Sequence, residues 1–246
     1  MRLVKTRGIV VGQSNAGDAD KVITLLTSNL GKISCFVKGA RRSKSRLLAG
    51  SQFLAYGEFV LFKGLEMYKV NTSDIIHPFY DIRNDVKRLA YAAYLTRLVR
   101  DVTRENQPAY RILQLFLNSL YMLSEEEKSY ELIGRIFEMR LMVLLGYGPH
   151  VSTCTGCVSK SEDTYFSFRA SGIKCQECAK GDASAISIMP GTAAALQHIA
   201  GADINRLFAF EVSSEVLNEL GIINKLYLSE KLDRDYDMAR FVEKFQ

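Results

Sequence analysis

The sequence predicts an α+β protein of several domains, in which a small N-terminal β-barrel precedes an α-helical bundle that carries an inserted four-cysteine zinc finger. Short segments rich in β-branched and apolar residues recur through residues 1–80. Beyond them, apolar residues recur at a helical period. Two Cys-x-x-Cys pairs interrupt the helical part. With 246 residues, 48% of them hydrophobic, the chain can bury one large core or a few smaller ones.

The pattern of residues 1–80 predicts five short strands. Turn-forming residues separate most of them, and only Gly64 and Leu65 join the fourth to the fifth, which suits a tight hairpin. A β module this small removes its exposed edges by closing, so we expect a closed or nearly closed barrel. The predicted strands are residues 3–12, 21–28, 32–39, 53–63 and 66–76.

The remainder has the character of amphipathic helices. The third is apolar nearly all round at its C-terminal end, which predicts a central place in the bundle. The predicted helices are residues 85–104, 109–123, 128–146, 190–201 and 213–232. The predicted domains are a barrel over 1–80, a helical domain whose first part is 81–149 and whose second part is 183–246, and a zinc-binding insert over 150–182.

The cysteine spacing is the most specific local signal. Cys154 and Cys157 form one pair, Cys175 and Cys178 the other, with 17 residues between the pairs. Two such knuckles can fill the four corners of a tetrahedron about Zn²⁺ and leave no position for water, which predicts one structural zinc ion. A thiol-disulfide exchange pair and a metal-free hairpin are the alternatives. Cys35 lies in a strand and is expected to be packed.

The excess positive charge belongs to the N-terminal part. Residues 1–80 hold 12 Lys and Arg against 5 Asp and Glu, a balance of +7, and the remaining 20 and 22 give −2. Such an asymmetry favours a polyanionic partner. We find no secretory signal pattern and no apolar run of membrane-spanning length, so we expect a cytoplasmic protein with no membrane partner. In a reducing compartment, paired cysteines favour metal over disulfides.

The segment VKGARRSKSR, residues 37–46, concentrates this charge. It lies between the third and fourth predicted strands and contains no acidic residue. A charge run can be a solvated face and nothing more, but this density in a barrel loop favours phosphate contact. Nothing in the segment suits base readout, so binding should be independent of nucleotide sequence and sensitive to salt. The predicted phosphate contacts are Lys38, Arg41, Arg42, Lys44 and Arg46.

Aromatic residues are interleaved in the hairpin that follows. Strand alternation should turn most of them into the barrel core and leave one or two outside, where a base could stack. They are Phe53, Tyr56, Phe59, Phe62 and Tyr68.

Catalytic motifs are absent. The sequence has no phosphate-binding loop, dinucleotide fingerprint, metalloprotease helix or nucleophile elbow. Asp18 and Asp20 could serve a nuclease or nucleotidyl transferase, but they suit a turn better. We therefore expect no enzyme. A second alternative is a zinc-ribbon accessory protein of transcription or replication. Its insert would have to bind nucleic acid, yet Lys160, Arg169, Lys174 and Lys180 are balanced there by Glu162, Asp163, Glu177 and Asp182.

Together these parts resemble the RecO family of bacterial recombination mediators over nearly the whole chain. The resemblance is carried by GIVVGQSNAGDADKVITLLTSNLGKISCFVKGARRSKSR, with its opening strand, acidic turn, short LG turn and KGARR-type loop. It is carried again by LLGYGPHVSTCTGC followed by CQEC.

The resemblance implies an N-terminal OB-fold that binds single- and double-stranded DNA, followed by a helical domain with a zinc site. It implies annealing of complementary strands coated by single-strand binding protein, and a complex with RecR that helps to load RecA in DNA repair and homologous recombination. It also implies a nucleoid-associated protein of the bacterial cytoplasm. On this resemblance the five cations of residues 38–46 are the DNA contacts and the four paired cysteines the zinc ligands.

Overall fold

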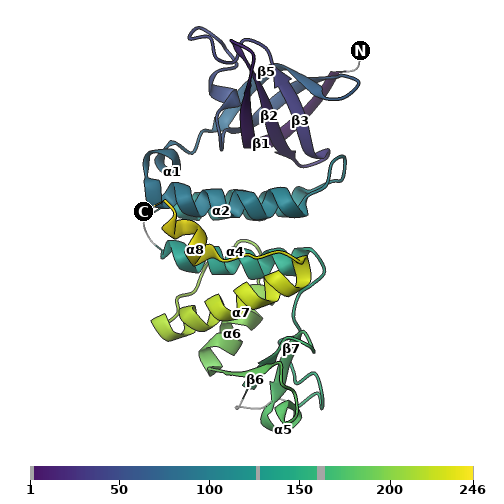
Figure 1. Cartoon of the computed structure of the whole chain (residues 1–246), viewed down its shortest axis with the longest axis vertical. Coiled ribbons are helices and arrows are strands. Elements are labelled where there is room, and N and C mark those ends of the chain that lie inside the picture. The colour runs from purple at the N-terminus through teal and green to yellow at the C-terminus, as the bar shows by residue number, and fades with distance from the viewer. Residues whose placement is uncertain (1–2, 126–127, 160–163, 246) are drawn as a thin grey trace. The chain divides into compact units, whose positions relative to one another are not determined.

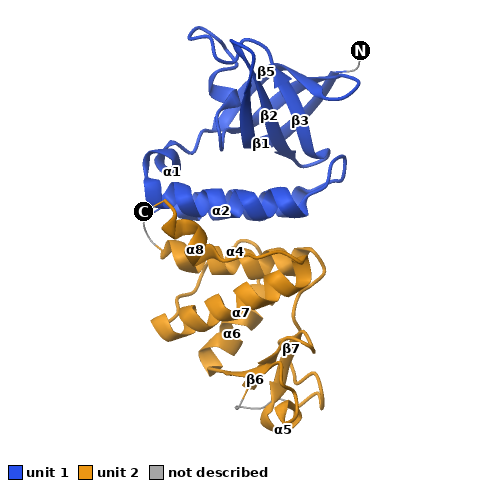
Figure 2. Cartoon of the chain, viewed as in Figure 1, with its two compact units in different colours: residues 1–125 blue, residues 126–246 orange. Residues whose placement is uncertain are grey.

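The computed structural model describes residues 3–125, 128–159 and 164–245 (Figure 1). The chain divides into two compact units, Met1–Glu125 and Glu126–Gln246 (Figure 2). Among the described residues, no helix is both long and apolar enough to span a lipid bilayer.

The first unit begins with the predicted barrel, which is closed and OB-like. Its strand order is β1-β2-β3-β5-β4, and β4 pairs back on β1. All of its strand pairs are antiparallel except β3 with β5. The strands are β1 Leu3–Ala16, β2 Asp20–Thr27, β3 Gly31–Val37, β4 Tyr56–Lys63 and β5 Tyr68–His77.

Strand alternation fills the barrel. The inward positions of β2 and β3 hold Ile23, Leu25, Ile33 and Cys35, all buried in one cluster. Cys35 is therefore packed, as predicted, and burial raises the pKa of its thiol to about 12. On β4, Phe59 is fully buried in this cluster.

Three helices complete the first unit, and α2 crosses one end of the barrel (Figure 1). They are α1 Tyr80–Asn84, α2 Val86–Val102 and α3 Tyr110–Ser124. Asp85 caps α2, since its side chain accepts a hydrogen bond from the backbone N–H of Arg88 at 2.9 Å. Residue 80, the predicted end of the barrel domain, is the first residue of α1, three residues after the end of β5.

The turn between β2 and β3 is attached to the loop between α2 and α3. The backbone N–H of Lys32 donates to the carbonyl of Arg104, and that of Ala109 donates to the carbonyl of Ser28. Gly31 lies between them with a φ of +65°. A Cβ atom at Gly31 would come within 2.2 Å of the Gln107 carbonyl oxygen, so this contact requires glycine.

The second unit packs helices around α4, which is buried on most of its surface, as predicted for a central helix. Asn224 of α7 donates to the carbonyl of Arg135 and to the buried carboxylate of Glu138, both on α4. The helices are α4 Tyr130–Leu144, α6 Pro190–Gly201, α7 Ser214–Leu232 and α8 Met238–Glu243. All five helices predicted from periodicity are present, with ends within two residues of those expected.

Residues 164–188 form a small antiparallel sheet that was not predicted from the sequence and that extends beyond the predicted end of the insert at residue 182. Its order is β7-β6-β8, with the one-turn helix α5 after β7. The elements are β6 Thr164–Ser167, β7 Gly172–Cys175, α5 Gln176–Ala179 and β8 Ala185–Ile188. Four-residue strands with mixed burial give too little periodicity to be recognised in the sequence.

Gly31 and Gly17, two barrel glycines with left-handed backbones, give a matched test of the contact between the β2–β3 turn and the α2–α3 loop. Gly31→Ala should lower the free energy of unfolding by about 3 kcal/mol or more, because a clash with backbone adds to the dihedral strain. Gly17, whose φ is +60°, has no atom within 4 Å of a built Cβ. Gly17→Ala should therefore cost only about 1 kcal/mol. Denaturant unfolding measures both, and equal losses would contradict the attachment.

Candidate nucleic-acid interface and metal centre

The basic loop, residues 38–48, follows β3 and leads to a short 3₁₀ turn at Ala49–Ser51. All five predicted contact residues are exposed to solvent: Lys38, Arg41, Arg42, Lys44 and Arg46. Ala40 lies among them but is fully buried in the barrel core. Its burial fixes the start of the loop on the barrel, so the neighbouring cations point outward.

The turn between β1 and β2 holds the basic loop in place. Asp20 accepts a hydrogen bond from the backbone N–H of Gly39 at 2.6 Å, where Gly39 has a φ of +68°. Arg41 donates its backbone N–H to the Ala19 carbonyl at 2.9 Å and its guanidinium to the Gly17 carbonyl at 3.2 Å. Asp20 thus has a structural role in the loop. It is the first residue of β2, whereas Asp18 lies in the turn, as predicted.

Successive turns shape the rest of the basic loop. Backbone N–H groups of Arg42, Ser45 and Leu48 each donate to the carbonyl three residues earlier, at 2.9 to 3.2 Å. Leu47 packs against the barrel core. The loop is therefore ordered by its own backbone, and its cations are held on a defined frame rather than on a free coil.

Lys21 adds a sixth cation at the base of the loop, and sequence reasoning missed it. It occupies an inward position of β2, and its ammonium donates to the side-chain oxygen of Gln13 at 2.9 Å. Burial and the nearby charge of Arg41 lower the pKa of Lys21. A lysine at an otherwise apolar inward position was the available signal. Together these cations concentrate positive potential at one end of the barrel.

The four paired cysteines come together in the insert. Cys154 and Cys157 lie on a turn, Cys175 ends β7, and Cys178 lies in α5. Their sulfur atoms all lie within 4.8 Å of one another, and those of Cys157 and Cys175 are 3.7 Å apart. Zn–S bonds of about 2.3 Å in a tetrahedron place sulfurs about 3.8 Å apart, so the cluster fits a zinc ion.

Gly156 permits this close approach. A Cβ atom at Gly156 would come within 2.8 Å of the Cys178 sulfur, so a side chain would push the two knuckles apart. Its backbone N–H donates to the Cys154 sulfur at 3.3 Å. These features belong to a site built for four sulfurs.

The thiols of the cluster ionise to different extents. Burial opposes ionisation of Cys154, yet backbone N–H groups of Cys175, Cys157 and Gly156 lower the pKa of its thiol to about 6. Hydrogen bonds from the Cys178 thiol to the other three sulfurs raise its pKa to about 12. Binding of a divalent cation by four thiolates would release the proton of Cys178.

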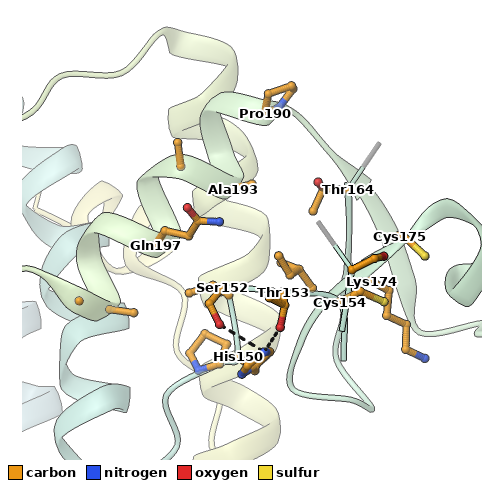
Figure 3. Close-up of a pocket in the computed structure, with 17 residues that line it drawn as sticks. His150, Ser152, Thr153, Cys154, Thr164, Lys174, Cys175, Pro190, Ala193 and Gln197 are labelled. Carbon is orange, nitrogen blue, oxygen red and sulfur yellow. Dashed lines mark hydrogen bonds between the residues drawn. The ribbon is translucent and has the colours of Figure 1, made fainter. Parts of the chain in front are cut away.

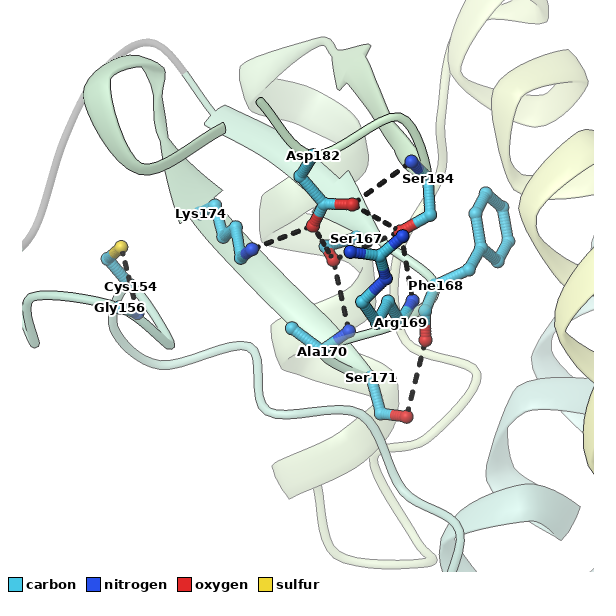
Figure 4. A network of polar contacts seen from close by, with 10 residues as sticks. All are labelled: Cys154, Gly156, Ser167, Phe168, Arg169, Ala170, Ser171, Lys174, Asp182 and Ser184. Atoms are coloured by element: carbon cyan, nitrogen blue, oxygen red, sulfur yellow. Dashed lines mark hydrogen bonds and ion pairs between the residues drawn. The ribbon is translucent and has the colours of Figure 1, made fainter. Parts of the chain in front are cut away.

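A buried carboxylate ties the small sheet together (Figure 4). Asp182 accepts hydrogen bonds from Lys174 at 2.7 Å, Ser167 at 2.6 Å and the Ser184 hydroxyl at 2.7 Å. These contacts, that of Lys174 foremost, hold the pKa of Asp182 well below its usual range. The network joins β6, β7 and the segment before β8.

A cleft of about 780 Å³ lies between the cysteine turn and α6 (Figure 3). His150 faces it, and its Nε2 atom is 2.8 Å from the Thr153 hydroxyl. Among the described residues, the side chains placed to hold a metal ion are the four paired cysteines, and His150 is not one of them. Lys160, Glu162 and Asp163, which entered the charge balance of the insert, lie outside the described residues.

Comparison with known proteins covers nearly the whole chain. Residues 1–79 match the family "Recombination protein O N terminal", and residues 83–239 match "Recombination protein O C terminal". A DNA repair protein RecO of Acetivibrio thermocellus is 50% identical over 99% of this chain and 97% of its own length. DNA repair proteins RecO of Alkaliphilus metalliredigens (94% and 95% covered) and Caldicellulosiruptor saccharolyticus (98% of each) are 37% and 34% identical.

Metal analysis tests the cysteine cluster. The purified protein should contain one zinc ion per chain, and Cys154→Ser should lose the ion and melt at a lower temperature, because a structural metal supplies folding free energy. Cys35→Ala is the matched control, since Cys35 lies in the barrel core and should leave the zinc content unchanged. A wild-type protein free of metal would contradict the prediction.

The pH dependence of stability tests the Asp182 network. A carboxyl whose pKa is lowered on folding stabilises the protein above its unfolded pKa of about 4, and this contribution is lost as pH falls through the folded pKa. Asp182→Asn should therefore melt below wild type at pH 7, and the difference should shrink as the pH is lowered below about 4. Thermal melts across this range measure it. A difference that stays constant with pH would contradict the assignment.

Proposed function

The chain belongs to the RecO family, and on that premise we propose that it is a DNA-binding recombination mediator without an active site of its own. Family membership gives it a role in DNA repair and recombination. The basic loop supports direct binding to DNA, and no catalytic motif stands beside it in the sequence. Asp20, one of the two carboxylates a nuclease would need, is engaged by the backbone of the loop.

The anchored basic loop is the observation that carries the proposal. Five exposed cations lie on residues 38–46, and the β1–β2 turn fixes the backbone at Gly39 and Arg41. Arginine grips phosphate oxygens in pairs and lysine acts as a point charge, so the loop suits a phosphodiester chain of any sequence. Both single- and double-stranded DNA present that chain.

Strand annealing follows from the same electrostatics. Two complementary strands repel each other through their phosphates, and a protein that neutralises several phosphates lets their bases meet. Base pairing then supplies the free energy. In this proposal the DNA strands are coated by single-strand binding protein before they anneal. The protein forms a complex with RecR, and this complex helps to load RecA onto the DNA. The protein acts in the bacterial cytoplasm, at the nucleoid.

The insert holds the zinc ion and takes no direct part in DNA binding. Two of its cations are already paired, because Lys174 contacts Asp182 at 2.7 Å and Lys180 contacts Glu177 at 2.6 Å. Paired cations offer little to phosphates. This weighs against the zinc-ribbon alternative, in which the insert itself would bind nucleic acid.

Neutralising the basic loop tests the proposed function. The triple variant Arg41→Ala, Arg42→Ala, Lys44→Ala should bind single-stranded DNA more weakly whatever its sequence. Each phosphate contact contributes about 0.7 to the slope of log K against log salt, so the slope should fall in magnitude by about 2. Fluorescence anisotropy across a salt series measures both quantities.

A matched control removes the same net charge from ion pairs of the second unit. Lys180, Lys231 and Arg240 pair with Glu177, Glu230 and Asp235. Their combined replacement by Ala should leave affinity and slope nearly unchanged. Equal losses in the two triple variants would show a general charge effect and would refute the assignment of the loop.

A further inference from the structure

Three residues form a continuous row across the outside of the barrel. Phe36 of β3 is the direct cross-strand partner of Lys69 of β5, and Lys69 is the direct partner of Phe62 of β4. Directly opposed side chains of paired strands lie about 5 Å apart, so the lysine stem runs between two rings. We call Phe36, Lys69 and Phe62 the aromatic row.

Strand alternation turns the aromatic row outward. Cys35 and Val37 on either side of Phe36 belong to the buried core, as does Leu61 beside Phe62. Both rings are half-buried and Lys69 is exposed. The rings therefore lie against the barrel and still reach solvent.

The aromatic row borders the basic loop at Phe36. Phe36 is two residues before Lys38, the first cation of the loop. Because β3 and β5 run parallel and Tyr68 pairs with Cys35, the β4–β5 turn, residues 64–67, lies toward the Gly31 end of β3 and away from the basic loop. That end of β3 is attached to the α2–α3 loop through Gly31. The Phe36 end of the row therefore borders the cations of the basic loop, and the Phe62 end lies farther from them.

We propose that the aromatic row stacks bases of a single DNA strand whose phosphates lie on the basic loop. This inference rests on the proposed function and deepens it, since it adds a base-binding site to a phosphate-binding one. Any base can stack on an aromatic ring, which agrees with DNA binding that is independent of nucleotide sequence. Lys69 between the rings and the cations beside them fit a polyanion rather than an uncharged peptide.

The spacing of the rings suits a bound single DNA strand that has not yet paired with its complement. Phe36 and Phe62 lie on strands either side of β5, so their backbones are about 10 Å apart, farther than stacked neighbouring bases. Bases held there are separated from one another. Stacking occupies their faces and leaves their hydrogen-bonding edges free for a complementary strand.

Base-dependent binding tests the aromatic row. Dissociation constants are measured for wild type with an oligothymidylate and with an abasic oligonucleotide of the same length, which keeps the phosphates and lacks the bases. Wild type should prefer the oligothymidylate by about tenfold. The double variant Phe36→Leu, Phe62→Leu should lose this preference, with unchanged abasic affinity and unchanged salt slope.

The double variant Phe36→Tyr, Phe62→Tyr is the matched control, because it keeps both rings and should keep the preference. Thermal melts establish that each variant is folded. Equal binding of both oligonucleotides by wild type, a preference that survives in the leucine variant, or equal weakening of both oligonucleotides by the leucine variant would each overturn the inference while leaving phosphate binding intact. Failure of wild type to bind either oligonucleotide would overturn the proposed function, and the inference with it.

Discussion

The parallel pairing of β3 with β5 is the constraint on which the interface depends. It closes the barrel through two register pairs, Cys35 with Tyr68 and Phe36 with Lys69. Because β5 lies between β3 and β4, the chain cannot return from β3 by a tight hairpin and must cross one end of the barrel over residues 38–55. That crossing carries the basic loop. The same pairing brings Phe36 beside Lys69, so closure sets both the charged and the aromatic parts of the surface.

The two units stabilise themselves by different means. The first fills a barrel with alternating apolar side chains and joins it to its helices through the tight contact at Gly31. The second contains a sheet of four-residue strands that buries Phe166 against Tyr227 and is held further by the Asp182 network and the cysteine cluster. A metal held there would support the fold, whereas the proposed DNA-binding residues belong to the first unit.

Local patterns allowed much of this architecture to be predicted. Strand alternation, helical period and cysteine spacing are properties of neighbouring residues, and the five strands, five long helices and cysteine cluster agree with them. Contacts between residues far apart in the sequence could not be predicted from such patterns. No pattern in the sequence shows that Phe36 lies beside Lys69, that Gly31 touches Gln107, or that Lys21 faces Arg41. The β6–β8 sheet was missed because its strands are too short to show a period.

The central claim is that the basic loop holds a strand by its phosphates while its bases remain free to pair. The most direct test is the rate at which two complementary strands, each coated with single-strand binding protein, anneal with wild type or with the variant lacking Arg41, Arg42 and Lys44. Our account predicts that wild type accelerates annealing strongly and that the variant does so far less, with a gap that narrows as salt rises. No acceleration by wild type, or equal acceleration by the variant, would contradict it.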